Sequence, residues 1–475
     1  MAIVGTEGDT WCEATKIKVI QMKVFFLLTV TFLIISMPIS AQEDTVQIEE
    51  ENVKKVVLPF LRITRDPDLS NARTKKELEY TSNIEESDIN EEDYLRIGGA
   101  LRLNYIYTYY EGETFPLGTA LRNDFTIDTW RLNVEGQSKG ILLSFEYRFY
   151  PTFNTHFIQH GWLGYNFSDK DQLQIGVTQV PFGNLKYASH SWWFQTPYYV
   201  GLEDDYDMGL KWRRQTSDWD FHLAYFLLYE PRGTSEPSFG ALSAARYSYD
   251  VVPVTGESNL ERNQFNLRAV RHVGNINAGI SLQRTEIFNL ETENKGNQWA
   301  GSVHLEGTFN HWNLNTEYIY YNYSNVENDL GEDLKFVQMG AYGFGTYDVA
   351  AEASMYVVGV SYSIPVQWGP LSNITIYNDY TYTQKHSKLE INGRKLDFQQ
   401  TQQNVLGALI TAGSVYTYVD LAMGQNHPWL TDNFGGANLG TGTPVNFNEP
   451  VSDLNPPDAN PDWNARLNIN IGYYF

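Results

Sequence analysis

Over most of the chain, apolar and polar residues alternate along many short segments. Near the C-terminus, Leu467, Ile469 and Ile471 fall on one side of this alternation, and Arg466 and Asn468 fall on the other. Successive side chains of a β-strand point to opposite faces of its sheet, so this period of two predicts strands with one apolar and one polar face. A long succession of such strands indicates a large sheet between an apolar and a polar surrounding.

The alternation predicts sixteen strands, which we place at 94–110, 124–137, 140–150, 156–167, 171–180, 206–215, 218–229, 262–273, 276–288, 297–309, 312–323, 353–364, 371–384, 399–412, 415–425 and 463–475. Connections after even-numbered strands are mostly tight, such as 216–217 and 274–275, whereas those after odd-numbered strands are mostly long, such as 230–261 and 426–462. Outer-membrane barrels combine short periplasmic turns with long extracellular loops. The sequence therefore predicts an all-β fold over 94–475: a transmembrane antiparallel β-barrel of about sixteen strands, in the outer membrane of a Gram-negative bacterium.

Aromatic residues near strand ends agree with a membrane barrel. Trp299 and Phe309 share the outward face of one predicted strand and lie at its two ends. At ~3.3 Å per residue and a tilt near 40°, their separation spans roughly 25 Å along the membrane normal, the height of the apolar band between two aromatic girdles. The surrounding partner implied by this band is outer-membrane lipid.

The first part of the chain differs from the rest in composition. Residues 22–41 combine Lys23, an apolar run and a small-residue end at Ala41, which predicts a secretory signal peptide, and residues 1–21 are interpreted as a mis-called start. Residues 42–93 are rich in charge and predict a periplasmic arm, with a pore plug as the alternative. The single cysteine, Cys12, would be removed with this leader.

Charge and histidine spacing narrow the function. The net charge of −23 argues against a nucleic-acid partner, because binding DNA or RNA requires basic groups along the phosphates. His156 and His160 are four residues apart, which strand alternation would place on one face, but they fit no ligand or nucleophile motif. We expect no enzyme, no metal and no cofactor.

At Gln174–Gly183 the sequence reads Gln-Ile-Gly-Val-Thr-Gln-Val-Pro-Phe-Gly. This segment resembles the phosphate-selective porin O and P family, in which a strand ends in Pro-Phe-Gly before the third extracellular loop. The resemblance covers 94–475 and implies a homotrimer whose third loop, here 184–205, folds into the barrel and narrows the pore. It also implies that the barrel-insertion machinery reads the aromatic C-terminal strand ending at Phe475.

The chain departs from this family at one position that matters for selectivity. The family often has a lysine two residues before the proline, where this chain has Gln179, and Lys186 is the only lysine of the third loop. The lysine-rich anion trap of the phosphate-specific members is therefore not visible. Phosphate selectivity does not follow from the resemblance.

The candidate pore-lining and solute-binding residues come from strand parity and from the third loop. The basic candidates are Arg96, Arg102, Arg131, Arg148, Lys186, Lys211, Arg213 and Arg268. The inward acidic residues are Glu135, Glu146, Glu306, Glu317, Asp379 and Asp420. A basic wall facing an acidic wall would set ion preference, and the alternative is a wet lumen that tolerates any polar residue.

The third loop offers aromatic and acidic candidates, with Trp192, Trp193, Glu203, Asp204 and Asp205 as its site residues. Its aromatic rings either stack on sugar rings or anchor the loop to the inner wall.

Three functions remain open at this point: a passive porin for small hydrophilic solutes, including anions such as phosphate; a saccharide-selective porin; and a non-conducting adhesin or receptor barrel.

Overall fold

A computed structural model of the chain describes residues 93–109, 124–185, 187–235, 242–343, 345–391, 394–430 and 463–475. The expected mis-called start, the signal peptide and nearly all of the expected periplasmic arm lie outside the described residues, as does Lys186 of the third loop. Among the described residues, no helix is both long enough and apolar enough to span a membrane.

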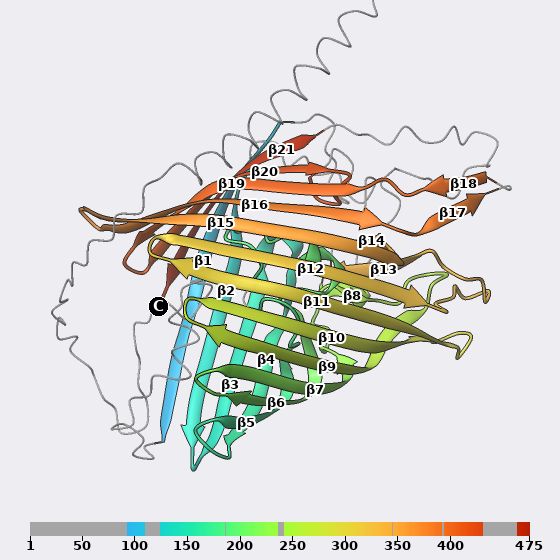
Figure 1. Cartoon of the computed structure of the whole chain (residues 1–475), viewed down its shortest axis with the longest axis horizontal. Coiled ribbons are helices and arrows are strands. Elements are labelled where there is room, and N and C mark those ends of the chain that lie inside the picture. Colours follow the sequence, from blue (N-terminus) through green and yellow to red (C-terminus); the bar gives the residue numbers. More distant parts are fainter. Residues whose placement is uncertain are drawn as a thin grey trace, which may run out of the picture. The chain divides into compact units, whose positions relative to one another are not determined.

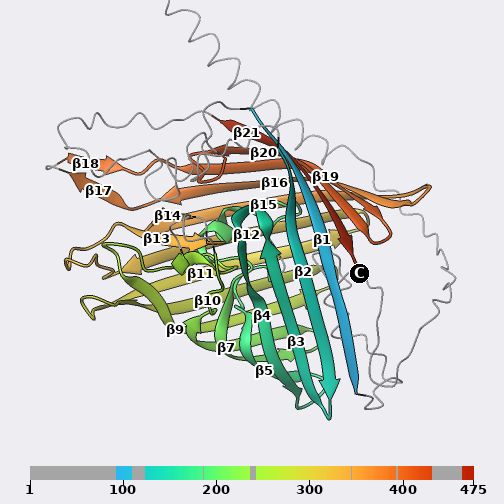
Figure 2. The same cartoon turned by 180° about the vertical axis from the view of Figure 1, so that it is seen from behind.

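The described part of the chain forms a closed antiparallel barrel of sixteen strands (Figures 1 and 2). Its strands are β1 (Tyr94–Thr108), β2 (Asp124–Ser138), β3 (Ile141–Tyr150), β4 (Thr155–Asn166), β5 (Asp171–Gln179), β6 (Tyr206–Gln215), β7 (Trp219–Tyr229), β9 (Asn259–Val273), β10 (Ile276–Asn289), β11 (Lys295–Phe309), β12 (Trp312–Ser324), β15 (Glu352–Trp368), β16 (Leu371–Lys385), β19 (Thr401–Ala412), β20 (Val415–Gln425) and β21 (Asn464–Tyr474). The expected fold class and all sixteen expected strands are confirmed.

Each barrel strand pairs with its neighbours along the chain, and the last strand closes the barrel on the first. In this closing pair Ala100 lies opposite Tyr474, and Gly99 and Phe475 exchange two backbone hydrogen bonds of 3.0 and 3.1 Å. Closure leaves no strand edge unpaired in the barrel, which is the condition for a sheet to stand in lipid.

The connections at one end of the barrel are tight. The links 139–140, 274–275, 310–311 and 413–414 each have two residues. Lys139 and Gly140 both have positive φ angles, 51° and 80°. Positive φ at both central residues is typical of a type I′ hairpin turn, whose twist matches that of the flanking strands. The link expected at 365–370 is shorter than predicted, because β15 continues through Pro365 to Trp368 past an irregular register.

The two faces of the barrel differ as the alternation predicts. The outer face exposes large apolar side chains, including Trp299, Val303 and Phe309 of β11 with exposed fractions of 56%, 60% and 45%. The inner face of the same strand carries the buried polar residues Ser302 and His304. A barrel with an apolar outside and a polar inside has the surface that a membrane-spanning β-protein needs.

Two small sheets accompany the barrel in the described residues. One contains β8 (Asp250–Val251), β13 (Phe336–Ala341) and β14 (Gly345–Ala350) in the order β14-β13-β8, and the other is the hairpin of β17 (Lys388–Ile391) and β18 (Arg394–Asp397). These five strands lie in segments that the sequence predicts as loops. The first sheet packs into a buried apolar cluster that also includes the third loop, with Tyr249, Met339 and Tyr347 among its members.

Candidate functional site

The third loop leaves the barrel wall at the Pro-Phe-Gly motif that follows β5. Gly183 has a φ of +61°, and a Cβ atom there would lie 2.1 Å from Oε1 of Glu317. Its N–H donates to Oγ of Ser281 over 3.0 Å, and its carbonyl accepts a hydrogen bond from Nε of Arg268 over 2.8 Å. The motif therefore turns the chain inward, against the inner faces of β9, β10 and β12.

Carboxylates on the far wall accept hydrogen bonds from the backbone of the third loop. Asp379 of β16 accepts the N–H groups of His190 and Ser191, both over 2.7 Å, and also contacts Nδ1 of His190 over 2.8 Å. Asp420 of β20 accepts the N–H of Trp192 over 3.1 Å. A loop inside a barrel has no strand partner for its amides, so it needs such acceptors.

Glu317 of β12 extends the same set of contacts. It accepts the N–H of Asn184 over 3.3 Å and the hydroxyl of Ser302 over 2.6 Å. We name Glu317, Asp379 and Asp420 the anchoring wall. These three expected inward acids face the barrel interior, and their oxygens hold the third loop.

Most of the third-loop aromatic rings are packed. Trp193, Tyr198 and Tyr199 are buried, and the rings of Phe194 and Tyr198 stack with their centroids 4.0 Å apart. Burial raises the pKa of Tyr198 well above its usual value, so its hydroxyl keeps its proton and serves as a neutral hydrogen-bonding group. The expectation that the aromatic rings anchor the loop therefore describes most of them.

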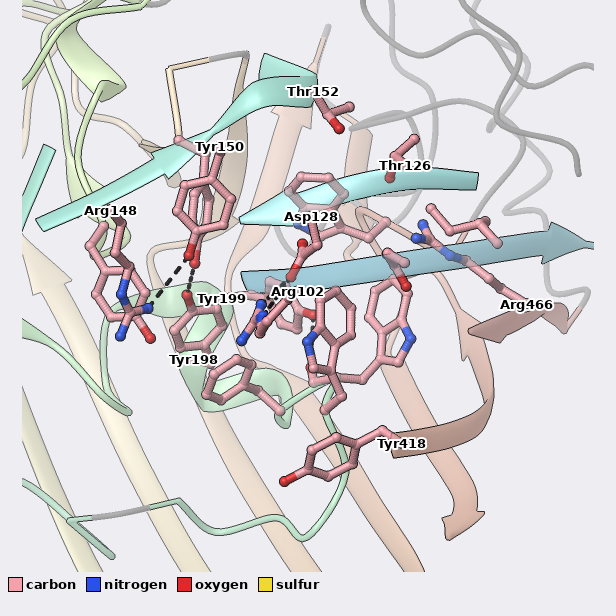
Figure 3. Close-up of a pocket in the computed structure, with 18 of the residues that line it drawn as sticks. Arg102, Thr126, Asp128, Arg148, Tyr150, Thr152, Tyr198, Tyr199, Tyr418 and Arg466 are labelled. Atoms are coloured by element: carbon pink, nitrogen blue, oxygen red, sulfur yellow. Dashed lines mark hydrogen bonds and ion pairs between the residues drawn. The ribbon is translucent and has the colours of Figure 1, made fainter. Parts of the chain in front are cut away.

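Between the third loop and strands β1–β3 lies a cavity of about 130 Å³ (Figure 3). Its described lining comprises Arg102, Asn104, Ile106, Thr126, Asp128, Arg131, Arg148, Tyr150, Thr152, Trp192, Trp193, Phe194, Tyr198, Tyr199, Tyr247, Tyr249, Tyr342, Tyr418, Trp429 and Arg466. The lining therefore combines four guanidinium groups with many aromatic rings. The space is large enough for several water molecules or a small solute.

Acidic partners neutralise part of the charge of these guanidinium groups. In Figure 3 Arg102 of β1 points toward Asp128 of β2, and the two form an ion pair. Glu146 pairs with Arg148 and lies 3.7 Å from Nη1 of Arg131. Among the described residues, four guanidinium groups thus face two carboxylates.

Three of the arginines also lie over aromatic rings. The guanidinium carbon of Arg102 is 5.7 Å from the ring centroid of Trp192, and that of Arg466 is 4.6 Å from the ring of Trp193. A similar distance of 4.3 Å separates Arg148 from Tyr247. Cation–π attraction thus draws Arg102 and Arg466 toward the third loop, and Arg148 toward Tyr247. We name Arg102, Arg131, Arg148 and Arg466 the basic wall.

Two charged residues of this site, Asp128 and Arg466, were not among those selected from the sequence. Asp128 is the extra residue of a β-bulge, because Arg102 pairs with Thr129 and Leu103 pairs with Ile127. The bulge brings Asp128 inward although plain alternation from Arg131 assigns it to the lipid face. Arg466 was placed on the inward face but was not selected as a site residue, although its parity in the last strand contained the signal.

A similar bulge in β4 changes the expected positions of His156 and His160. His156 lies opposite Phe149, whereas His160 lies opposite Glu146, with Gln159 as the extra residue between them. The two rings therefore face opposite sides of the wall, and the expectation of one shared face is wrong. Each ring has hydrogen-bond partners, such as Tyr147 OH at 2.7 Å for His156.

The remaining expected site residues lie away from this cavity. Lys211 and Arg268 are buried on β6 and β9, and Arg96 pairs with Glu135 over 3.2 Å nearer the end of β1. Arg213 of β6 donates a hydrogen bond to Gln215. None of these four basic residues is among the described residues that line the cavity.

The three acids at the end of the third loop are buried within its packing. Glu203 accepts the N–H of Ala188 over 2.9 Å, and Asp204 accepts a hydrogen bond from the hydroxyl of Tyr247. Asp205 has an exposed fraction of 5%. None of the three is among the described residues that line the cavity.

Comparison of the chain with protein-family models and with curated proteins gives no match. Solved structures of similar fold include the outer-membrane-expressed OmpT of Vibrio cholerae, which is 12% identical with a TM-score of 0.46, over 81% of this chain and 98% of that one. The outer membrane channel DcaP of Acinetobacter baumannii is 11% identical with a TM-score of 0.49, over 81% and 97%. An anion-selective porin from Comamonas acidovorans is 10% identical with a TM-score of 0.47, over 81% and 100%.

Proposed function

We propose that this protein is a porin in the outer membrane of a Gram-negative bacterium, through which small hydrophilic solutes diffuse passively, with a preference for anions. The observation that carries the proposal is the cavity between the third loop and the basic wall, inside a closed barrel with an apolar outer face. Inorganic phosphate is one anion of suitable size and charge. The long connections and their loops are extracellular, and the tight turns face the periplasm.

The preference for anions follows from distance. Charged groups that are exposed on distant loops are screened within a Debye length of about 8 Å at physiological salt. The guanidinium groups of the basic wall act at contact range on a solute in the cavity. The pore therefore favours anions although the whole chain carries a net charge of −23.

Planar-bilayer recording of the purified protein tests this proposal. We expect stepwise currents and, under a salt gradient, a reversal potential with the sign of anion preference that becomes larger at low salt. A protein that inserts into the bilayer without conducting would contradict the pore and favour an adhesin or receptor barrel. A conducting pore with cation preference would contradict only the selectivity.

A saccharide-selective pore is the second candidate, and one observation favours it. Trp192 and Phe194 line the cavity and are only partly buried, and Trp192 lies beside the guanidinium group of Arg102. Aromatic faces next to hydrogen-bond donors are suited to sugar rings. Neutral sugars added to the bilayer should then reduce the current, and Trp192→Ala should abolish that block. Unchanged currents with sugar would exclude this candidate.

Assembly and targeting form part of the same proposal. The protein forms a homotrimer, and the barrel-insertion machinery reads β21, whose Tyr473 faces outward with an exposed fraction of 40%. Deletion of 473–475 should leave unassembled periplasmic protein, whereas a heat-modifiable barrel after this deletion would contradict recognition of the strand. N-terminal sequencing of the mature protein, with cleavage expected near Ala41, tests the signal peptide.

A further inference from the structure

Five carboxylates gather where the third loop rejoins the barrel wall. Asp205 and Asp207 lie at the start of β6, Glu230 follows β7, Asp250 belongs to β8 and Glu261 belongs to β9. The exposed fraction of each side chain is 7% or less, so solvent water does not stabilise these charges. No other group of the described residues brings three carboxylates close enough together to hold one metal ion.

The described residues supply this group with little positive charge. Arg246 is its ion-pair partner, with Nη1 donating to Oδ2 of Asp250 over 3.0 Å. One guanidinium group against five carboxylates leaves a buried negative excess. Buried charges of one sign are unfavourable unless they are paired, protonated or bound to a metal ion.

Several oxygens of the group are buried and accept no hydrogen bond. Gln264 donates to Oδ2 of Asp207 over 2.9 Å, and the N–H of Ser248 donates to Oε1 of Glu230 over 2.7 Å. The oxygens left over are Oδ1 of Asp205, Oδ1 of Asp207 and Oε2 of Glu230. Buried carboxylate oxygens normally have a hydrogen-bonding or metal partner. Glu230 is fully buried, its carboxylate lies against that of Asp250, and its Oε2 accepts no hydrogen bond. Such an oxygen indicates a ligand.

The spacing of the oxygens fits one ion. Carboxylate oxygens of Asp205, Asp207 and Asp250 all lie within 4.8 Å of one another. Ca²⁺ binds oxygen at 2.3–2.6 Å, so two of its ligands are at most about 5 Å apart. Three protein carboxylates favour Ca²⁺ over Mg²⁺, because Mg²⁺ demands near-ideal octahedral geometry and usually keeps several waters with only one or two carboxylates. We propose that Asp205, Asp207 and Asp250 bind a Ca²⁺ ion, with Glu230 as a neighbouring carboxylate that strengthens its binding.

The position of this site gives the ion a structural role. Asp205 and Asp207 end the third loop, and Asp250 belongs to the segment that carries Tyr247 and Tyr249 into the cavity lining. A bound Ca²⁺ ion would tie these two segments together and fix the width of the cavity. This last consequence, unlike the site itself, rests on the proposed function.

Terbium luminescence of the purified protein, refolded in detergent without lipopolysaccharide, tests the site. Tb³⁺ replaces Ca²⁺ on oxygen ligands, and tyrosines adjacent in sequence, Tyr206 and Tyr249, can sensitise it. We expect saturable luminescence that Ca²⁺ displaces at about tenfold lower concentration than Mg²⁺ does. The double variant D205N/D207N should weaken Ca²⁺ binding by about tenfold or more.

The matched control is Asp348→Asn, which alters a buried aspartate outside the group, bonded to Gln338 over 2.7 Å, and should change Ca²⁺ binding less than about twofold. If D205N/D207N does not refold, Glu230→Gln should still weaken binding, and Ca²⁺ should raise the Tm of the wild-type protein relative to EDTA. Luminescence that Ca²⁺ does not displace, binding that persists in a refolded D205N/D207N variant, or a Tm insensitive to Ca²⁺ would each overturn the proposal. None of these measurements requires conduction, so their failure is distinct from a failure of the pore.

Discussion

The basic wall and the anchoring wall both consist of charged side chains, but the two sets have different roles. Both sets point inward from barrel strands, as the alternation of side chains along a strand requires. The arginines of the basic wall line the cavity, whereas the carboxylates of the anchoring wall accept hydrogen bonds from amides of the third loop. Inward charges therefore fall into two groups: those that line the cavity and those that hold the third loop.

This difference changes the expected electrostatics of the pore. Two opposed walls of free charge would create a transverse field across the cavity, as the sequence suggested. The carboxylates of Asp379 and Asp420 are instead fully buried under the loop, with exposed fractions of 0%. The third loop thus covers the acidic side, and among the described residues the cavity lining carries the arginines of the basic wall and none of the carboxylates of the anchoring wall.

Removal of an anchor should have the largest effect. Asp379→Ala deletes the acceptor of two loop amides and the partner of His190, and we expect a loss of about 3 kcal/mol in local loop stability. The freed loop should raise single-channel conductance and its noise in bilayers. Asp128→Ala on the opposite wall is the matched control and should leave the loop in place. Equal conductance in both variants would show that the two walls do not differ in this way.

A substitution at Gly183 tests whether the turn of the Pro-Phe-Gly motif directs the third loop into the barrel. Gly183→Ala places a Cβ atom against Glu317 in addition to the strain of a positive φ, and we expect about 2 kcal/mol of destabilisation, measured by urea unfolding in detergent. Gly256→Ala is matched in backbone strain, with φ +88°, but its Cβ would meet nothing within 4 Å. If both variants lose the same stability, the contact with Glu317 contributes nothing.

Neutralising the basic wall should shift selectivity without freeing the loop. In the triple variant R102Q/R131Q/R148Q, the anion-to-cation permeability ratio should fall by at least about fivefold at low salt, since even one unit charge at 4 Å in water contributes about 1 kcal/mol. The change should shrink at high salt because of screening. An unchanged reversal potential at low salt would mean that these arginines do not face the ion path.

The smallest effect is expected at an inward pair outside the cavity. Arg96 and Glu135 form an ion pair whose glutamate side chain is 32% exposed. Arg96→Gln should change stability by less than about 0.5 kcal/mol and should alter the reversal potential much less than Arg102→Gln does. If the two single variants shift the reversal potential equally, inward position alone, and not the cavity, decides selectivity.

The sequence by itself determined the barrel. A period of two is a local property, so each strand could be placed from its own residues, and the confirmed strands include β11 and β21. The Pro-Phe-Gly motif also located the entry of the third loop. The inward direction of Arg102 and Arg148 followed from the same alternation, because a wet interior and a lipid exterior select opposite side chains.

Only the tertiary structure decided which inward charges line the cavity and which are buried under the third loop. The acceptor of the His190 amide is Asp379, 189 residues away along the chain, and no local pattern records that pairing. The bulge at Asp128 likewise depends on how β2 pairs with β1. Backbone amides of a loop inside a barrel need acceptors across the interior. The carboxylates on distant strands that accept these hydrogen bonds are buried under the loop.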